Sequence, residues 1–362
     1  MQIHSLTFIV FLLVSTCFGL STAIECRVNV KNPSKYAYTI TVDQTGKGNF
    51  VTIQKAVDSV PSNNDQWLRI HVHPGIYMEK VTIPKEKQCI FLEGSGYTQT
   101  TISGEDHSQT DSSATFTMLP DNFVAKGIAF MKTQIRYLAC LTFNTNNVVI
   151  IQLKNSYNRP IVVDEVKPAV AARIYGDKAA FYDCAFLGFQ DTLWDVEGRH
   201  YFNSCYIEGA IDFIWGDGQS FFEECRINVT AGLLPSQVSA GYITAQGRQS
   251  EEDPGGFVFE NGYVFGTGQA YLGRAYRPYS RVIFHGTTLD SVVVSAGWDA
   301  SKYQGHEENL TYAEIGCKGA GASTSKRVEW EKKNFDGSLQ KEFSRDRFIN
   351  KDGWLGNQPM SS

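Results

Sequence analysis

The sequence predicts an all-β fold, a parallel β-solenoid in one domain, and three observations support that prediction. An aromatic-rich motif that leads into a cysteine recurs at Cys184, Cys205 and Cys225, with spacings of 21 and 20 residues. The chain contains 32 Gly, 23 Phe and 17 Tyr, which fit many short strands joined by tight turns. Helical periodicity is scarce. A unit of about 20 residues is too short for a sandwich hairpin with its loops, and it matches one coil of a solenoid.

The strand-forming units follow one another along the chain, bounded by Gly, Asn or Asp. Three of them align without gaps, and the others are weaker relatives. The aligned units are Phe181–Phe186, Tyr201–Ile207 and Phe221–Ile227, and the relatives are Phe123–Phe130, Phe257–Val264 and Val282–Leu289. The segment Thr52–Val60, which ends at Pro61, predicts a short helix that covers the N-terminal end of the solenoid. No Pro-rich or Ser-rich linker divides the chain, so we expect one elongated domain.

The first residues predict a secretory signal peptide. Residues 6–20 form an apolar run followed by small residues at 21–23, although residues 1–5 carry no Lys or Arg. We therefore expect a signal peptide at 1–23, a lead segment at 24–38 and the solenoid domain at 39–362, with no membrane span. Sequons at Asn228 and Asn309 agree with export as a glycoprotein. Cleavage of this signal peptide would remove Cys17 and leave seven cysteines. An odd number predicts at least one unpaired thiol in an oxidising compartment.

Composition and motif content exclude several functional classes. Lys and Arg total 33 against 38 Asp and Glu, a net charge of −5, so the chain lacks the broad basic surface of a nucleic-acid-binding protein. Its sequence has no Gly-x-Ser-x-Gly motif, no phosphate-binding Gly-Lys-Ser/Thr loop and no His-Glu-x-x-His motif. It also has no Cys-x-x-Cys spacing of a structural zinc site. We expect neither a metal nor an organic cofactor.

Two aspartates occupy the same place in successive repeats. Asp191 follows Cys184 by seven residues, and Asp212 follows Cys205 by seven residues. Stacked strands lie about 4.7–4.9 Å apart, so this register predicts two carboxyl groups that face each other. Two carboxylates so close do not both ionise easily, and one pKa rises. The pair would then supply a neutral general acid beside an ionised nucleophile.

The residues around this pair extend the hypothesis. Gln190 could donate its amide N–H to a developing oxyanion. Asp212 lies in the apolar segment 211–216, where a charge needs a partner, and Arg274 could provide it. The alternative is a structural aspartate ladder with a bridging arginine. The matched register and the adjacent glutamine favour the catalytic interpretation.

Four segments in this order resemble the plant pectin methylesterases (pectinesterases). They are Gly75–Glu79, Gly188–Leu193, Asp212–Gly216 and Leu272–Arg274. The likeness extends from about residue 39 to the C-terminal region, and the sequence at 172–177 is similar to the shorter plant forms that lack an inhibitor-like pro-region. The resemblance implies a right-handed parallel β-helix with long loops around a groove. It also implies a secreted, monomeric cell-wall enzyme that hydrolyses galacturonate methyl esters in methyl-esterified homogalacturonan (pectin), with a proteinaceous inhibitor as a further partner.

The resemblance assigns a role to each residue of the candidate site. Asp212 would attack the ester carbonyl, while Asp191 would protonate the departing methanol and then accept a proton from the hydrolytic water. Gln190 would stabilise the oxyanion, and Arg274 would keep Asp212 ionised and oriented. A further group shares an aromatic ring that could stack on sugars along the groove or pack inside the solenoid. These residues are Trp194, Trp215, Tyr276 and Trp298.

The chain departs from the family pattern at three places. Pro168 stands where the family usually has a glutamine that serves as a second oxyanion donor. Loss of one such donor typically costs about 10²–10³ in rate. The usual Pro-Trp after the arginine is Ala275-Tyr276, which we expect to alter sugar contacts. Asp217 replaces a common asparagine, and its charge could raise the pKa of Asp212.

Two other functions are compatible with these residues. Close carboxylates about 5–5.5 Å apart also serve retaining glycosidases, so a different pectin-active enzyme on the same solenoid is one alternative. The other is a pectin-binding homologue that is inactive because of Pro168. Release of methanol, new reducing ends, or binding without turnover would distinguish the three.

Overall fold

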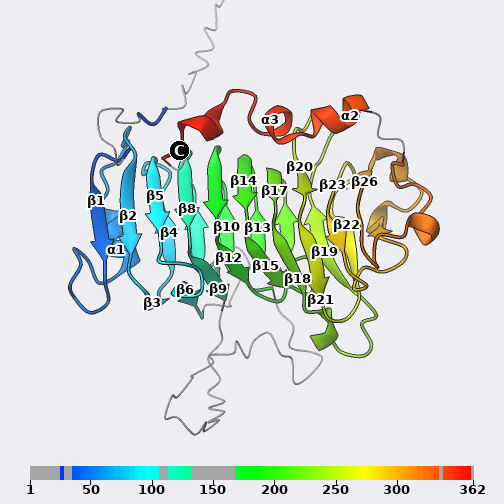
Figure 1. Cartoon of the computed structure of the whole chain (residues 1–362), viewed down its shortest axis with the longest axis horizontal. Coiled ribbons are helices and arrows are strands. Elements are labelled where there is room, and N and C mark those ends of the chain that lie inside the picture. Colours follow the sequence, from blue (N-terminus) through cyan, green and yellow to red (C-terminus); the bar gives the residue numbers. More distant parts are fainter. Residues whose placement is uncertain (1–24, 28–34, 106–112, 133–167, 334–336, 360–362) are drawn as a thin grey trace, which may run out of the picture.

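The computed structural model describes residues 25–27, 35–105, 113–132, 168–333 and 337–359. In these residues the chain winds into a right-handed parallel β-helix with one ten-stranded sheet and two eight-stranded sheets. Figure 1 shows the strands stacked side by side from β1 at one end to β26 at the other. Neighbouring strands in each sheet run parallel and come from successive coils. The predicted all-β solenoid is confirmed.

The three sheets run along the length of the solenoid. The first sheet contains β1 (Thr39–Val42), β2 (Leu68–Val72), β5 (Ile90–Glu93), β8 (Phe123–Lys126), β11 (Ala179–Tyr182), β14 (Arg199–Asn203), β17 (Gln219–Glu223), β20 (Gly256–Glu260), β23 (Arg281–His285) and β26 (Thr311–Ile315). The second sheet contains β4 (Val81–Ile83), β7 (Phe116–Met118), β10 (Ala172–Ile174), β13 (Leu193–Asp195), β16 (Ile214–Gly216), β19 (Gly241–Gln246), β22 (Ala270–Ala275) and β25 (Trp298–Asp299). The third sheet contains β3 (Gly75–Met78), β6 (Thr100–Gly104), β9 (Ala129–Lys132), β12 (Ala185–Leu187), β15 (Tyr206–Gly209), β18 (Arg226–Val229), β21 (Tyr263–Gly266) and β24 (Thr288–Leu289).

Helices are short and lie outside the sheets. The α-helices are α1 (Ile53–Ser59), α2 (Gly337–Glu342) and α3 (Arg345–Phe348). The 3₁₀ turns are η2 (Ala231–Leu233), η3 (Ser301–Tyr303), η4 (Glu307–Asn309), η5 (Thr324–Lys326) and η6 (Trp354–Asn357). None of these helices, which are those of the described part of the chain, has the length and apolar character of a membrane span.

The turn from the first sheet into the third is a stack of residues in the left-handed backbone conformation. This turn stack has φ between 48° and 63° at Gly127, Asp183, Ser204, Glu224, Asn261, Gly286 and Gly316. Glycine adopts this conformation freely, and Asn and Asp tolerate it better than most other residues. The requirement explains why small or short polar residues bound the repeats that the sequence shows.

The interior of the solenoid is filled by ladders of identical side chains. The rings of Phe202, Phe222, Phe259 and Phe284 stack in succession with centroids 4.5, 4.5 and 4.4 Å apart. The thiols of Cys184, Cys205 and Cys225 are free and buried. The prediction of unpaired thiols is therefore confirmed. A disulfide joins Cys26 to Cys89, and Cys140 lies outside the described residues.

Helix α1 packs against the N-terminal end of the solenoid, as predicted. It buries Ile53, Ala56 and Val57 in the core. The carboxylate of Glu79 accepts hydrogen bonds from the backbone N–H groups of Ile53 and Gln54 at 2.8 and 2.9 Å. These are donors that a helix leaves unpaired at its start, so Glu79 anchors the helix to the coil below.

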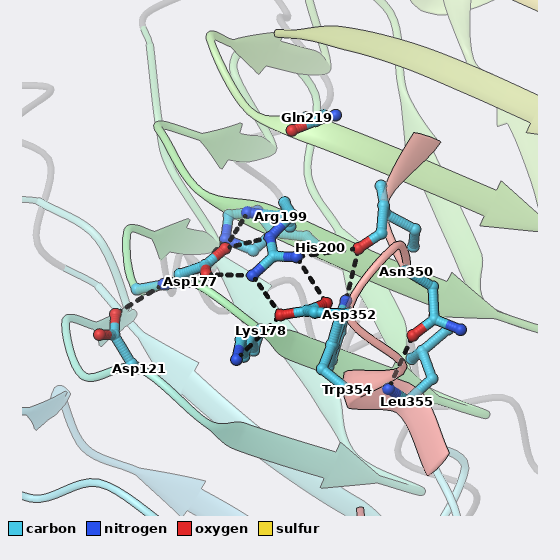
Figure 2. A network of polar contacts seen from close by, with 12 residues as sticks. Asp121, Asp177, Lys178, Arg199, His200, Gln219, Asn350, Asp352, Trp354 and Leu355 are labelled. Atoms are coloured by element: carbon cyan, nitrogen blue, oxygen red, sulfur yellow. Dashed lines mark hydrogen bonds and ion pairs between the residues drawn. The ribbon is translucent and has the colours of Figure 1, made fainter. Parts of the chain in front are cut away.

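The C-terminal segment, residues 345–358, runs back over the first sheet (Figure 1). Arg199 on β14 connects it to the solenoid, because its guanidinium donates to Asp177 at 2.7 Å and to Asp352 at 2.8 Å (Figure 2). Lys178 also lies 3.1 Å from Asp352. The expected signal peptide at 1–23 and most of the lead segment at 24–38 lie outside the described residues.

Candidate active site

Asp191 and Asp212 lie in adjacent coils at the entrance to the second sheet. Asp191 precedes β13 and Asp212 precedes β16. A parallel bridge pairs Gln190 with Ile211, and the next strand positions pair Leu193 with Ile214. The register inferred from the spacing is therefore correct, and the two aspartates are neighbours along the stack.

A tight turn presents both carboxyl groups. Asp191 and Asp212 have φ of 57° and 48°, the left-handed conformation. A glycine precedes each by three residues, and a side chain at either glycine would collide with the returning chain. A Cβ at Gly188 would lie 2.4 Å from the Thr192 Oγ1, and one at Gly209 would lie 2.2 Å from the Phe213 Cβ. The repeated turn thus displays an aspartate at the same point of each coil.

Arg274 on β22 binds only one of the two carboxylates. Its Nε donates to the Asp212 Oδ1 at 2.8 Å, and its second nitrogen, Nη2, donates to the Asp212 Oδ2. The side chain of Asp212 is only 9% exposed, so this two-point contact is shielded from water. Asp212 therefore has a fixed orientation and a cationic partner that Asp191 does not share.

The surroundings separate the titration of the two aspartates. Burial raises the pKa of Asp191 to about 7, and the charge of Asp212 adds to the rise while Arg274 opposes it. Burial also raises the pKa of Asp212, but its hydrogen bonds with Arg274 and the arginine charge oppose that rise. Because the arginine contact is direct at Asp212, this carboxyl loses its proton first. Between the pKa of Asp212 and that of Asp191, the arrangement gives an ionised Asp212 beside a protonated Asp191.

Gln190 and Pro168 lie beside the pair. The carbonyl of Gln190 accepts a hydrogen bond from the backbone N–H of Ala169 at 3.2 Å, which brings the start of the preceding coil against it. The side chain of Gln190 is partly exposed, and no hydrogen bond to it is found among the described residues. Its amide is thus available to an incoming oxyanion. Pro168 brings no side-chain donor to the neighbouring coil.

Three of the four predicted aromatic residues form one cluster next to the aspartates. The rings of Trp194 and Trp215 stack with centroids 4.3 Å apart, and Tyr276 meets Trp215 edge-on at 6.2 Å. Tyr276 is 41% exposed. Trp298 is different, because it is 1% exposed and packs against Tyr312 at 4.7 Å inside the core. Burial removes Trp298 from the residues that could stack on a sugar.

Asp217 contacts a different set of groups. Its carboxylate accepts a hydrogen bond from Gln249 at 3.4 Å. Burial and the charge of Asp253 raise its pKa to about 6. The shift at Asp212 is accounted for by burial and Arg274, so the expected effect of Asp217 on that carboxyl is not seen.

The sequence reasoning missed two residues of the second sheet. Arg173 on β10 lies over Trp194, with its guanidinium carbon 4.7 Å from the ring centre. Tyr242 on β19 lies under Arg274, 4.8 Å from the guanidinium carbon. The pairing of Trp215 with Ala245 places Tyr242 beside Asp212 in the next coil. The offset of 30 positions from Asp212 to Tyr242 breaks the regular spacing of 20 or 21, so no repeat signal identified Tyr242.

The side chains of the site supply several reactive groups. Across the described residues, no group of three or more His, Cys, Asp or Glu is arranged to hold a metal ion. The site offers a carboxylate nucleophile, a carboxylic acid, an amide donor and a guanidinium. This set is complete for acyl transfer.

Comparison with known proteins gives a consistent result. The family model described as Pectinesterase matches residues 39–136 and 139–352. The Arabidopsis thaliana protein named "Probable pectinesterase 55" is 46% identical over 348 residues, covering 95% of each chain. "Pectinesterase QRT1" from the same plant is 35% identical over 336 residues, covering 90% of this chain and 80% of the relative.

Solved structures show the same fold. The pectin methylesterase from carrot is 27% identical, with a TM-score of 0.75, and the match covers 88% of this chain and 95% of the carrot chain. The pectin methylesterase from Aspergillus niger is 26% identical, with a TM-score of 0.68, over 90% of this chain and 97% of the other.

Proposed function

The chain belongs to the pectinesterase family and is a pectin methylesterase, and we propose that it works through an acyl-enzyme on Asp212. The observation that supports this mechanism is the asymmetric pair: two stacked aspartates, of which Asp212 alone is clamped by Arg274. An ionised carboxylate and a protonated carboxyl thus face the same space. Hydrolysis of a methyl ester through an acyl-enzyme can use the first as nucleophile and the second as general acid.

In the first half of the reaction, the Asp212 carboxylate attacks the ester carbonyl carbon of a methylated galacturonate. The negative charge that develops on the carbonyl oxygen is stabilised by the Gln190 amide. The carbon–methoxy bond breaks, and Asp191 gives its proton to the methoxy oxygen, so methanol leaves. The products of this step are an anhydride between Asp212 and the sugar acid, and an ionised Asp191.

In the second half, water hydrolyses the anhydride. Asp191, now ionised, takes a proton from the water as its oxygen bonds to the sugar acyl carbon. The bond to Asp212 breaks and restores the carboxylate that Arg274 holds. The product galacturonic acid releases its proton to solvent, and Asp191 is protonated again for the next turnover.

The substrate and the location are proposals that the family and the chain support. We propose methyl-esterified homogalacturonan as the substrate, bound along the groove by Trp194, Trp215 and Tyr276. We also propose that the protein is a monomer secreted into the cell wall, glycosylated at its sequons and subject to a proteinaceous inhibitor. The Cys26–Cys89 disulfide supports export, because such bonds form and persist in oxidising compartments.

The test is methanol release from methylated pectin by the purified protein and by Asp212→Asn. We expect the variant to lose essentially all activity with an unchanged circular dichroism spectrum. Asp183→Asn is the matched control, because Asp183 also has a left-handed backbone, with φ of 48°, at a different turn. It should remain active. Full activity in Asp212→Asn, new reducing ends without methanol, or binding without turnover would each contradict the proposal.

A further inference from the structure

Tyr242 contacts Arg274, the arginine that binds Asp212. Its ring faces the Arg274 guanidinium at 4.8 Å, and its pairing position lies next to Asp212. The ring also stacks on that of Tyr271, its pairing partner on β22, at 5.3 Å with an interplanar angle of 14°. The mechanism above gives Tyr242 no role in bond making or breaking.

The hydroxyl of Tyr242 binds a third carboxylate, that of Asp299. It donates a hydrogen bond to the Asp299 Oδ2 at 2.9 Å. The other oxygen, Oδ1, accepts the backbone N–H of Ser301 at 2.7 Å. Burial and the contact with Asp299 raise the pKa of Tyr242 to about 12, so the phenol keeps its proton and remains a donor. Both oxygens of Asp299 therefore have donors without Arg274.

Asp299 is placed where it could compete for the arginine. It pairs with Arg274 directly across the boundary between β22 and β25, so the two side chains start from adjacent positions on the same face. The ion pair that Arg274 makes is nevertheless with Asp212. A neighbouring carboxylate without a donor would attract the guanidinium and weaken its hold on Asp212.

We propose that Tyr242 is a positioning residue for the esterase reaction. Its hydroxyl donates a hydrogen bond to Asp299, so that the Arg274 guanidinium pairs with Asp212 rather than with Asp299. This inference rests on the proposed function of Asp212 as the nucleophile. Tyr242 does not touch the reacting atoms. It determines which of the two aspartates, Asp212 or Asp299, forms the ion pair with Arg274.

The charged and titratable groups around Asp212 come from several elements. Asp191 faces it from the preceding coil, Arg274 from β22, and the phenol of buried Tyr312 from β26. Tyr242, Asp299 and Tyr271 complete the set around the arginine. The hydrogen bond between Tyr242 and Asp299 can be removed by deleting a single oxygen atom, and the Tyr242 ring and all charges then stay in place.

The experiment measures methanol release as kcat/KM against pH for the full mature protein and four variants. Tyr242→Phe should lower kcat/KM by roughly 3- to 10-fold at acidic pH, the range of one ordinary hydrogen bond. Its acid limb should move to higher pH, because Asp212 shares its arginine and holds its proton more strongly. KM should change little. Tyr242→Phe combined with Asp299→Asn should return the acid limb to the wild-type position, because the competing carboxylate is gone.

Two further variants and the wild-type protein serve as controls. Tyr271→Phe, which stacks on Tyr242, and Asp299→Asn alone should keep the acid limb at or below the wild-type pH. An unshifted limb in Tyr242→Phe, or a shift that persists in the double variant, would overturn the inference and leave methanol release by the wild type intact. Absence of methanol release by the wild type would overturn the proposed function together with it.

Discussion

At the residue scale, Asp191 and Asp212 have the same type of side chain and the same left-handed backbone conformation. They differ in the charged groups that surround each carboxyl. Asp212 receives the two-point contact from Arg274, and Asp191 receives the field of Asp212. The division of labour between acid and nucleophile therefore depends on the arginine. Its strand lies 62 residues later in the chain.

The first prediction concerns the pH dependence of catalysis. The raised pKa of Asp191, about 7, means that the general acid is protonated below that pH and is lost above it. We expect kcat/KM for methanol release to fall as pH rises through about 7. Glu331→Gln is the control, because burial and Glu314 also raise the pKa of Glu331 to about 7. An alkaline limb that disappears in Glu331→Gln would contradict the assignment to Asp191.

The second prediction concerns Pro168. A glutamine there would stand on the coil that meets Gln190 and could add a second oxyanion donor. We expect Pro168→Gln to raise kcat by about tenfold or more, in line with the value of one such donor. Steady-state methanol release measures it. An unchanged kcat with an intact fold would show that position 168 does not reach the oxyanion.

At the element scale, the turn stack explains why the repeats are regular in the sequence and over which coils that regularity predicts the structure. The strands around Cys184, Cys205 and Cys225 were predictable because the coils there have nearly the same length, 21 and 20 residues, and the same left-handed turn. Where a coil is lengthened, as between Asp212 and Tyr242, equal spacing fails and only the three-dimensional register shows the contact. The aspartate pair was thus predictable, whereas Tyr242 was not.

Burial was the other quantity that the sequence did not reveal. Trp298 and Trp215 both follow short apolar stretches, yet one is enclosed by Tyr312 and the other forms the aromatic cluster beside the aspartates. The difference arises from the direction each side chain takes from its strand. A one-residue change of register reverses that direction.

The third prediction tests the turn stack. Glu224 is an exposed, unbranched residue held at φ of 55°. Glycine relieves the left-handed backbone cost of about 1–2 kcal/mol, while valine increases it. We expect the free energy of unfolding, measured by urea denaturation, to be about 2 kcal/mol higher for Glu224→Gly than for Glu224→Val. Equal stabilities would show that the turn is not under this constraint.

At the scale of the whole molecule, the C-terminal segment contacts several coils of the solenoid that are distant in sequence from it and from one another. Beyond the contacts of Arg199, the Tyr182 hydroxyl donates to Gln358 at 2.8 Å, and the Trp67 indole donates to the Asn357 carbonyl at 3.2 Å. The segment has no repeat of its own. Its position could therefore not be read from the periodicity that defines the solenoid.

The fourth prediction concerns this segment and its dependence on pH. Asp352 is partly desolvated, which raises its pKa, but Arg199 and Lys178 outweigh this and lower it to about 2. Its contribution is therefore present at pH above the unfolded value of about 4 and is lost as pH falls through about 2. Because the side chain is 42% exposed, we expect Asp352→Asn to cost about 1 kcal/mol or less.

Amide hydrogen exchange of residues 345–358 measures the effect. Exchange should be faster in Asp352→Asn at neutral pH. It should be unchanged in Asp346→Asn, whose side chain is 72% exposed. Equal exchange in both variants would show that the ion pairs of Arg199 do not hold the segment.

The central claim is that Asp212 carries the acyl group. Its most direct test is to quench the protein with hydroxylamine during turnover of methylated pectin and to map modified residues by mass spectrometry. Hydroxylamine can attack either carbonyl carbon of the anhydride, and attack at the aspartyl carbonyl leaves a hydroxamate at Asp212. We expect a hydroxamate at Asp212 that depends on substrate and is absent from Asp212→Asn. Modification at Asp191 instead would contradict this assignment. So would methanol release that yields a hydroxamate neither at Asp212 nor, above the level seen with Asp212→Asn, on the galacturonate product.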